Sequence, residues 1–453
     1  MKKSVLVLAV GCWWCLGLVA CGGGRPKDPP SGLSQRVLAS QGVTSAASFG
    51  GLVIINGYND TLPRLAPIGA GSQPGLMAIT PSRNIVAAFD ASSNNVYAVD
   101  TFREAPMGSV HLAGPTTSFV LPTATSLGYA AVPAASVTGF SFTGAVQEMN
   151  FPTGSLITTI AVPSAETLVS NQAGTQLLVF SNDSDSITVL FPAIAVPPVD
   201  TSCFNPPNPV CVIVAEPTGS RPVNAIVSGN TAYIFNCGYE CGGLTTGGQP
   251  APAGIAIFDL TSLTFTGTIP VNGATFGFLS SSTLYVAGKG SPTGPLCASL
   301  TNSINPTTAA TYCGTLDIVN LTTMTDPYLN SPSTEIAIPD GYHDRMDMSS
   351  NGQLFVGSYD CTNIGNVNEP SGEVRGCLAI YNTNDNSLII PPDNGDVTGL
   401  QSFTTYYKEY VAEDGNLRVY DTLTDVLLIN DYLPEGNIDI VGYVGDIKSI
   451  DSF

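Results

Sequence analysis

Short apolar runs separated by polar turns dominate the chain after residue 40. The runs are four to seven residues long and rich in Val, Ile, Tyr and Phe, whereas Gly, Asn, Asp and Thr fill the turns. This composition and spacing predict β-strands. Some runs, such as IAIF at residues 255–258, are apolar at every position, so both faces of the predicted sheets should be covered by other parts of the protein.

The runs recur as a repeat of four strands. The clearest back half of a repeat is GIAIFDLTSLTFTGTIPV at residues 254–271. Segment 52–68 has the pattern of a back half, that is, of the third and fourth strands of a repeat, but no first and second strands precede it. Conversely, the first strand nearest the C-terminus is not followed by a back half. First strands are expected near residues 75, 117, 166, 223, 274, 345, 398 and 437. We therefore predict an all-β protein, a β-propeller of eight four-stranded blades, seven complete and one split between the termini, with seven blades as the alternative.

The back-half pattern V-x-V-x-D-T resembles the YVTN and NHL-type β-propeller repeats of secreted bacterial proteins. The resemblance covers about residues 50–450, and it implies the propeller architecture. Propellers related in this way include lactonase-like hydrolases as well as surface proteins without known chemistry. The resemblance therefore leaves the activity open.

The N-terminus has the features of an export signal. Lys2 and Lys3 precede an apolar stretch that runs to about residue 20, which is short for a membrane span. The sequence LVAC at residues 18–21, followed by glycines, resembles the lipobox of bacterial lipoproteins. This resemblance implies a signal peptide at 1–20, a lipidated Cys21 that starts a Gly/Pro/Ser-rich tether at 21–48, and a single propeller domain at 49–453.

Two other export routes remain open, an ordinary secretory signal and a signal anchor that is never cut. In lipoproteins, a residue other than Asp after the lipidated Cys implies the outer membrane, and this chain has Gly22. We therefore expect a protein of the bacterial cell envelope whose only contact with the membrane is its lipid anchor.

The charge balance narrows the range of partners. The chain has 35 acidic and 15 basic residues, so its net charge is −20, although charged residues make up only 11% of it. This excess of carboxylates would repel nucleic-acid phosphates, so we exclude nucleic acid as a partner. Cationic partners or divalent ions are favoured instead. We expect a monomer that binds a protein or a polysaccharide of the cell envelope.

Eight cysteines remain beyond the signal and Cys21, an even number that predicts disulfides in an exported chain. Zinc is a poor alternative, since this part of the chain has no CxxC motif and no His lies near a cysteine pair. The cysteines form four local couples: Cys203–Cys211, Cys237–Cys241, Cys297–Cys313 and Cys361–Cys377.

Three long insertions between second and third strands belong to consecutive blades. They span residues 237–253, 289–313 and 359–376, and each holds one cysteine couple, with Cys377 directly after the end of the third. In a propeller, these loops and the loops that enter the next blade lie on one rim. We interpret the insertions as a binding rim, because functional residues concentrate on loops held by a rigid scaffold. The alternative is that these insertions arose by neutral drift and have no function, and that the disulfides make them tolerable to the fold.

The segment GYHDRMDMSSNG at residues 341–352 has the highest density of chemically active side chains. It enters a first strand near the predicted channel, where carboxylates and an imidazole suit a divalent metal. Other blade entrances offer further ligands. The candidate metal ligands are His343, Asp344, Asp347, Asp396, Glu435 and Asn272, and the candidate binding cations are Arg221 and Arg345. The alternative is that His343 is a structural loop residue and Asp344–Arg345 a surface ion pair.

Two functions fit these observations. The favoured one is a lipid-anchored, extracytoplasmic propeller that binds a partner through one loop-rich rim, without catalysis and without a cofactor. The other is a lactonase-like hydrolase in which a divalent cation at the channel polarises an ester or lactone carbonyl. The chain has two histidines, which leaves little room for a Ser-His-Asp triad. Whether the protein is an enzyme stays open at this stage.

Overall fold

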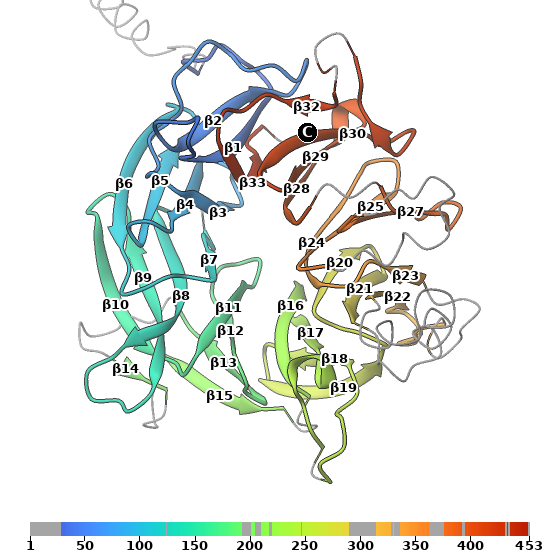
Figure 1. Cartoon of the computed structure of the whole chain (residues 1–453). Coiled ribbons are helices and arrows are strands. Elements are labelled where there is room, and N and C mark those ends of the chain that lie inside the picture. Colours follow the sequence, from blue (N-terminus) through green and yellow to red (C-terminus); the bar gives the residue numbers. More distant parts are fainter. Residues whose placement is uncertain are drawn as a thin grey trace, which may run out of the picture.

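Eight β-sheets form a closed ring around a central channel, as Figure 1 shows. This computed structural model describes residues 29–451 apart from 124, 193–200, 204–209, 217–219, 246, 290–313, 328, 330–335, 362–375, 392–394, 431, 432 and 434. The predicted all-β propeller of eight blades, with one blade split between the termini, is confirmed.

One strand of each sheet faces the channel and contacts the equivalent strand of the next sheet, which makes the channel wall continuous. These inner strands begin near the predicted positions except for the last one. In order around the ring, they are β33 (Tyr443–Ser449), β3 (Pro74–Ile79), β7 (Ser118–Val120), β11 (Ala165–Ser170), β16 (Pro222–Ser228), β20 (Phe276–Ser280), β24 (Tyr342–Met348) and β28 (Val397–Phe403).

The remaining strands pair outward from each inner strand in antiparallel order. The second strands are β1 (Arg36–Gly42), β4 (Ile85–Asp90), β8 (Leu127–Ser136), β12 (Leu177–Ser181), β17 (Thr231–Asn236), β21 (Thr283–Lys289), β25 (Gln353–Tyr359) and β29 (Lys408–Glu413). The third strands are β2 (Gly51–Asn56), β5 (Asn95–Asp100), β9 (Thr143–Asn150), β13 (Ser186–Leu190), β18 (Gly254–Asp259), β22 (Gly314–Asn320), β26 (Leu378–Asn382) and β30 (Asn416–Asp421).

The outer strands are shorter or more exposed, because only one face of each is covered. They are β6 (Ala105–His111), β10 (Ser155–Ala161), β15 (Cys211–Ala215), β19 (Thr264–Pro270), β23 (Ile336–Ile338), β27 (Leu388–Ile389) and β31 (Val426–Leu427). Two further short strands are added at edges: β14 (Thr201–Ser202) pairs with β10 in parallel, and β32 (Asn437–Ile438) pairs with β30.

The hydrophobic core lies between neighbouring sheets rather than at one centre. One cluster, for example, joins Phe89 and Ala98 of one blade to Val132 and Met149 of the next. Middle strands must therefore be apolar on both faces, and all six residues of β4 are buried. This packing explains the consecutive apolar positions in the sequence.

The split blade closes the ring, and here two predicted boundaries are wrong. β1 lies inside the segment 21–48 that we expected to be a tether, and all seven of its residues are buried because it pairs with β2 on one edge and β33 on the other. The inner strand from the C-terminus begins at Tyr443 rather than near residue 437, where β32 instead extends another blade. The N-terminal segment thus supplies the second strand as well as the back half.

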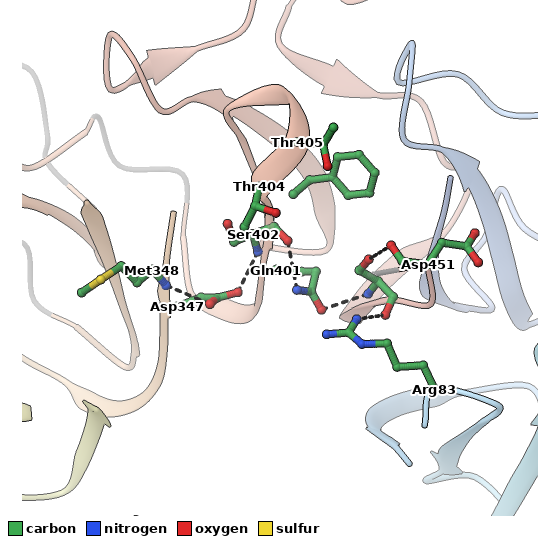
Figure 2. A pocket seen from close by; sticks show the side chains of 10 residues that line it. Arg83, Asp347, Met348, Gln401, Ser402, Thr404, Thr405 and Asp451 are labelled. Atoms are coloured by element: carbon green, nitrogen blue, oxygen red, sulfur yellow. Dashed lines mark hydrogen bonds between the residues drawn. The ribbon is translucent and has the colours of Figure 1, made fainter. Parts of the chain in front are cut away.

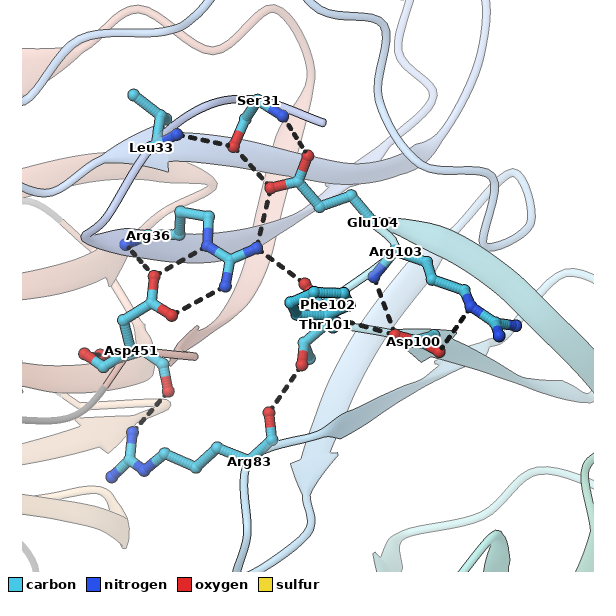
Figure 3. A network of polar contacts seen from close by, with 11 residues as sticks. Ser31, Leu33, Arg36, Arg83, Asp100, Thr101, Phe102, Arg103, Glu104 and Asp451 are labelled. Atoms are coloured by element: carbon cyan, nitrogen blue, oxygen red, sulfur yellow. Dashed lines mark hydrogen bonds and ion pairs between the residues drawn. The ribbon is translucent and has the colours of Figure 1, made fainter. Parts of the chain in front are cut away.

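A buried ionic network fixes this closure (Figure 3). The Arg36 guanidinium donates from Nη1 to Glu104 Oε1 and from Nη2 to Asp451 Oδ1, both at 2.8 Å. Nη1 also donates to the Thr101 carbonyl oxygen at 2.7 Å. The side chains of Arg36 and Glu104 are only 7% and 3% exposed. One side chain on β1 therefore ties the N-terminal strand to the C-terminal end and to the adjacent blade.

Three of the four predicted disulfides are formed: Cys203–Cys211, Cys237–Cys241 and Cys361–Cys377. The fourth couple, Cys297 and Cys313, lies outside the described residues, as do Cys21 and most of the insertions at 289–313 and 359–376. Within the described part of the chain, no helix is long and apolar enough to cross a membrane.

Replacement of Arg36 by Met should lower the free energy of unfolding by about 3 kcal/mol, because it leaves Glu104 and Asp451 buried without their cation. Urea denaturation of the Arg36→Met variant measures this loss. Arg103, 79% exposed in the adjacent blade beside Glu104, provides the control, and Arg103→Met should cost less than about 0.5 kcal/mol. Equal small losses in the two variants would contradict a closing role for Arg36.

Candidate functional site

Charged side chains on the channel wall are concentrated on a few inner strands. β24 carries His343, Asp344, Arg345 and Asp347, β33 carries Asp446 and Lys448, and β11 carries Glu166. The other five inner strands have no Asp, Glu, Lys, Arg or His. One sector of the channel is therefore far more polar than the rest, in a chain with few charges.

Several of these side chains accept hydrogen bonds from backbone N–H groups of the neighbouring blade. Asp347 accepts from Ser402 N at 2.7 Å, and Asp446 accepts from Met77 N at 2.8 Å. Gln401 Oε1 accepts from Ser449 N at 2.9 Å. Inner strands have one edge without a partner strand, so these contacts satisfy donors that would otherwise face the channel unpaired.

Asp344 and Arg345 form an ion pair of 2.8 Å on this wall, as the sequence alternative suggested. Their side chains keep 38% and 28% exposure. Arg345 Nε also donates to the Thr398 carbonyl oxygen at 2.9 Å, so it bridges β24 and β28. Burial raises the pKa of Asp344, and the Asp446 charge adds to this, although Arg345 lowers it.

His343 is buried, with 3% exposure, and its Nε2 lies 2.8 Å from the Pro339 carbonyl oxygen. Nε2 must therefore carry the proton, and Nδ1 has no hydrogen-bond partner among the described residues. Burial lowers the pKa of His343 to about 4, so the imidazole is neutral at physiological pH. This geometry is that of a structural histidine between two blades.

The other predicted ligands are dispersed. Asn272 donates to Asp317 at 2.9 Å, Asp396 accepts from Asp360 N at 2.9 Å, and Glu435 lines a surface groove with Asp439. Arg221 lies 3.9 Å from Asp185. Among the described residues, no three His, Cys, Asp or Glu side chains are grouped so that they could hold a metal ion.

At one mouth of the channel, two tyrosines that the sequence reading missed are stacked. Tyr342 opens β24 and Tyr359 ends β25, and their ring centroids are 5.2 Å apart. Lys289 Nζ lies 4.7 Å from the Tyr342 ring centroid, and its backbone N donates to Glu240 Oε2 at 2.7 Å. Both tyrosines remain exposed, at 46% and 37%. The sequence signal for this pair was that Tyr342 and Tyr359 lie opposite each other when the two adjacent strands pair.

Carboxylates continue this surface along the same rim to a third exposed tyrosine. Asp360 follows Tyr359 and donates its N–H to Asp396, and the charges of Asp396 and Asp414 raise the pKa of Tyr443 after burial does so. The Tyr443 ring lies against Gly415, where an added Cβ would come within 2.3 Å of the ring. We call Tyr342, Tyr359, Tyr443, Asp360, Asp396 and Asp414 the tyrosine–carboxylate arc.

The opposite end of the channel holds a cavity of about 170 Å³, the channel-end cavity. Figure 2 shows Asp347 and the Arg83 guanidinium on opposite sides of it, with Gln401 and Ser402 between them. The cavity is built from β24, β28, the end of β33 and the turn between β3 and β4. Of its charged residues, only Asp347 is among the metal ligands predicted from the sequence.

Comparisons with known proteins support the architecture. No family model and no curated protein matches the chain, so its resemblance to YVTN and NHL repeats is not shown at the family level. Among solved structures, it is similar to the dihydro-heme d1 dehydrogenase NirN in complex with DHE, with a TM-score of 0.58 and 10% identity over 94% of this chain and 79% of that one.

The chain is also similar to the Dos1 propeller, with a TM-score of 0.54 and 9% identity over 83% of this chain and 86% of that one. At such identities, both likenesses establish the fold alone.

The buried His343 predicts a specific acid sensitivity. The folded state favours the neutral imidazole, so the stability this gives is present above pH 6.5 and is lost as the pH falls towards 4. Between these values, wild type should lose on the order of 3 kcal/mol relative to His343→Gln, whose amide can still donate to Pro339. Parallel urea titrations at several pH values measure the difference. A constant difference between the two proteins would contradict the buried neutral state.

Proposed function

We propose that this protein is a lipid-anchored, extracytoplasmic binding module whose partner docks on the tyrosine–carboxylate arc. The observation that carries the proposal is the series of exposed tyrosines and carboxylates along one channel mouth. The three disulfides and the lipobox-like N-terminus support a location outside the cytoplasm.

The arc suits a cationic partner. Tyrosine ring faces attract ammonium and guanidinium groups, and Lys289 already occupies such a position over Tyr342. Burial raises the pKa of Tyr359 to about 12, and the carboxylates of Asp344 and Asp360 contribute to the rise. Tyrosine also provides a large contact area at low entropic cost, so it is frequent at binding hot spots.

A protein segment that bears Lys or Arg fits these features better than a neutral polysaccharide. A neutral sugar would stack on the rings but would gain nothing from the charges of Asp360, Asp396 and Asp414. A cationic side chain would use both the rings and the carboxylates. The net charge of −20 would further speed the approach of such a partner at low salt.

The wall residues support binding rather than hydrolysis. Asp347 accepts two backbone N–H groups, and His343 lies between blades with its protonated nitrogen on a carbonyl oxygen. These contacts explain why Asp and His occur on the wall without requiring them to act on a substrate.

A labelled peptide of alternating Lys and Gly should bind the propeller, and binding should weaken at least about tenfold in D360N/D396N/D414N, a loss of about 1.4 kcal/mol. Fluorescence anisotropy at low and high salt measures this affinity. A triple substitution at Asp100, Asp259 and Asp385 removes the same charge from turns on the opposite rim, where Asn also accepts turn N–H groups, and it should bind nearly as wild type.

Equal losses in the two triple variants would show that only the overall charge matters, and the arc would be the wrong surface. Binding of a neutral oligosaccharide that survives D360N/D396N/D414N but fails in Y342S/Y359S would favour a polysaccharide partner and overturn the cationic one.

A further inference from the structure

We propose that the channel-end cavity binds a small zwitterion with one carboxylate and one ammonium group, of the size and charge of a free amino acid. This site is at the other end of the channel from the tyrosine–carboxylate arc and shares no residue with it. The inference therefore stands independently of the proposed function.

Arg83 is the first reason for an anionic group in this ligand. Its guanidinium is half-buried, and among the described residues its one hydrogen bond is from Nη1 to the Ser449 carbonyl oxygen at 2.5 Å. Within the described part of the chain, no carboxylate forms an ion pair with it, and the nearby Asp451 is taken by Arg36. Burial lowers the pKa of Arg83 despite the charges of Asp347 and Asp451. A cation in this position is undercompensated and would gain from a carboxylate partner.

The backbone at Arg83 is the second reason. Arg83 has φ of 56°, in the left-handed region, and its N–H donates to Thr80 O in the turn between β3 and β4. The equivalent turns of two other blades make the same bond, from Gly174 to Asn171 and from Gly352 to Ser349. Those turns place glycine, with φ of 67° and 91°, where this turn has Arg83. Arg83 thus takes a conformation that is unfavourable for a side chain, as Ser281 and Tyr407 do in the turns after two other inner strands, and of these three residues only Arg83 lines the cavity.

Asp347 supplies the opposite charge on the facing wall. Each of its carboxylate oxygens accepts one backbone N–H, from Met348 at 2.8 Å and from Ser402 at 2.7 Å, which leaves lone pairs free for a further donor. Burial, followed by the Asp347 charge, raises the pKa of Glu409 behind this wall well above its usual range. Burial raises the pKa of Asp347 as well, whereas its two backbone N–H donors and the charges of Lys448 and Arg83 lower it.

Size and charge together define the ligand. A cavity of about 170 Å³ corresponds to about five or six waters, which is enough for a single small molecule and too little for a polymer segment. A phosphate dianion would be repelled by Asp347, and a simple carboxylate or amine would pair with only one of the two charges. A ligand with both charges satisfies Arg83 and Asp347 together.

Isothermal titration of the full propeller with glycine or L-serine should give saturable binding, at least about tenfold tighter than acetate or methylammonium alone. Arg83→Gly should weaken that binding at least about tenfold. Because this turn geometry already accommodates glycine elsewhere in the ring, the variant should fold and keep its melting temperature. Arg103→Ser, at an exposed site of the same blade, should bind as wild type.

Three results would overturn the proposal. They are no saturable binding of either amino acid, undiminished binding in Arg83→Gly, and acetate binding as tightly as glycine, which would indicate a simple anion site. The melting temperature of Arg83→Gly distinguishes loss of the site from loss of the fold. Retained peptide binding at the arc gives a second check that the variant is intact.

Discussion

The pairing of the last strand with the first is the constraint on which the rest of the structure depends. β33 pairs with β1, and only this pairing brings the inner edges of all eight sheets onto one channel. Without it, β1 would lie at an open sheet edge and β33 would have no partner strand. The Arg36 network lies at this junction and joins the strand from the N-terminus to Asp451 and to Glu104 of the next blade.

Closure creates a second requirement, because each inner strand then presents unpaired backbone groups to the channel. This requirement is met where side chains of the inner strands accept N–H groups across blade boundaries, as Asp347, Gln401 and Asp446 do. This explains why a chain with so few charged residues concentrates several of them on β24 and β33. The same side chains give one sector of the channel its polarity, so the scaffold and the candidate sites share their residues.

The architecture could be predicted from the sequence because the packing of blades on both faces demands consecutive apolar residues, which recur along the chain. The start of the domain could not, since β1 has the sequence RVLASQG within a Gly/Ser-rich segment and becomes buried only when β2 and the distant β33 flank it. His343 was recognisable as unusual, but its burial against Pro339 depends on the neighbouring blade. Side-chain direction on the wall was equally hidden, as the dispersal of Asn272, Asp396 and Glu435 shows.

The two ends of the channel differ because all inner strands run in the same direction. Turns between first and second strands therefore share one rim, and blade entrances share the other. A single change in a repeated turn, such as Arg83 in the place of Gly174 or Gly352, puts a side chain at the channel without altering the ring. Likewise, Tyr342 and Tyr359 occupy the ends of strands whose interiors are needed for packing. Arg83 and the two tyrosines thus add to the wall carboxylates at positions that the closure of the ring leaves unconstrained.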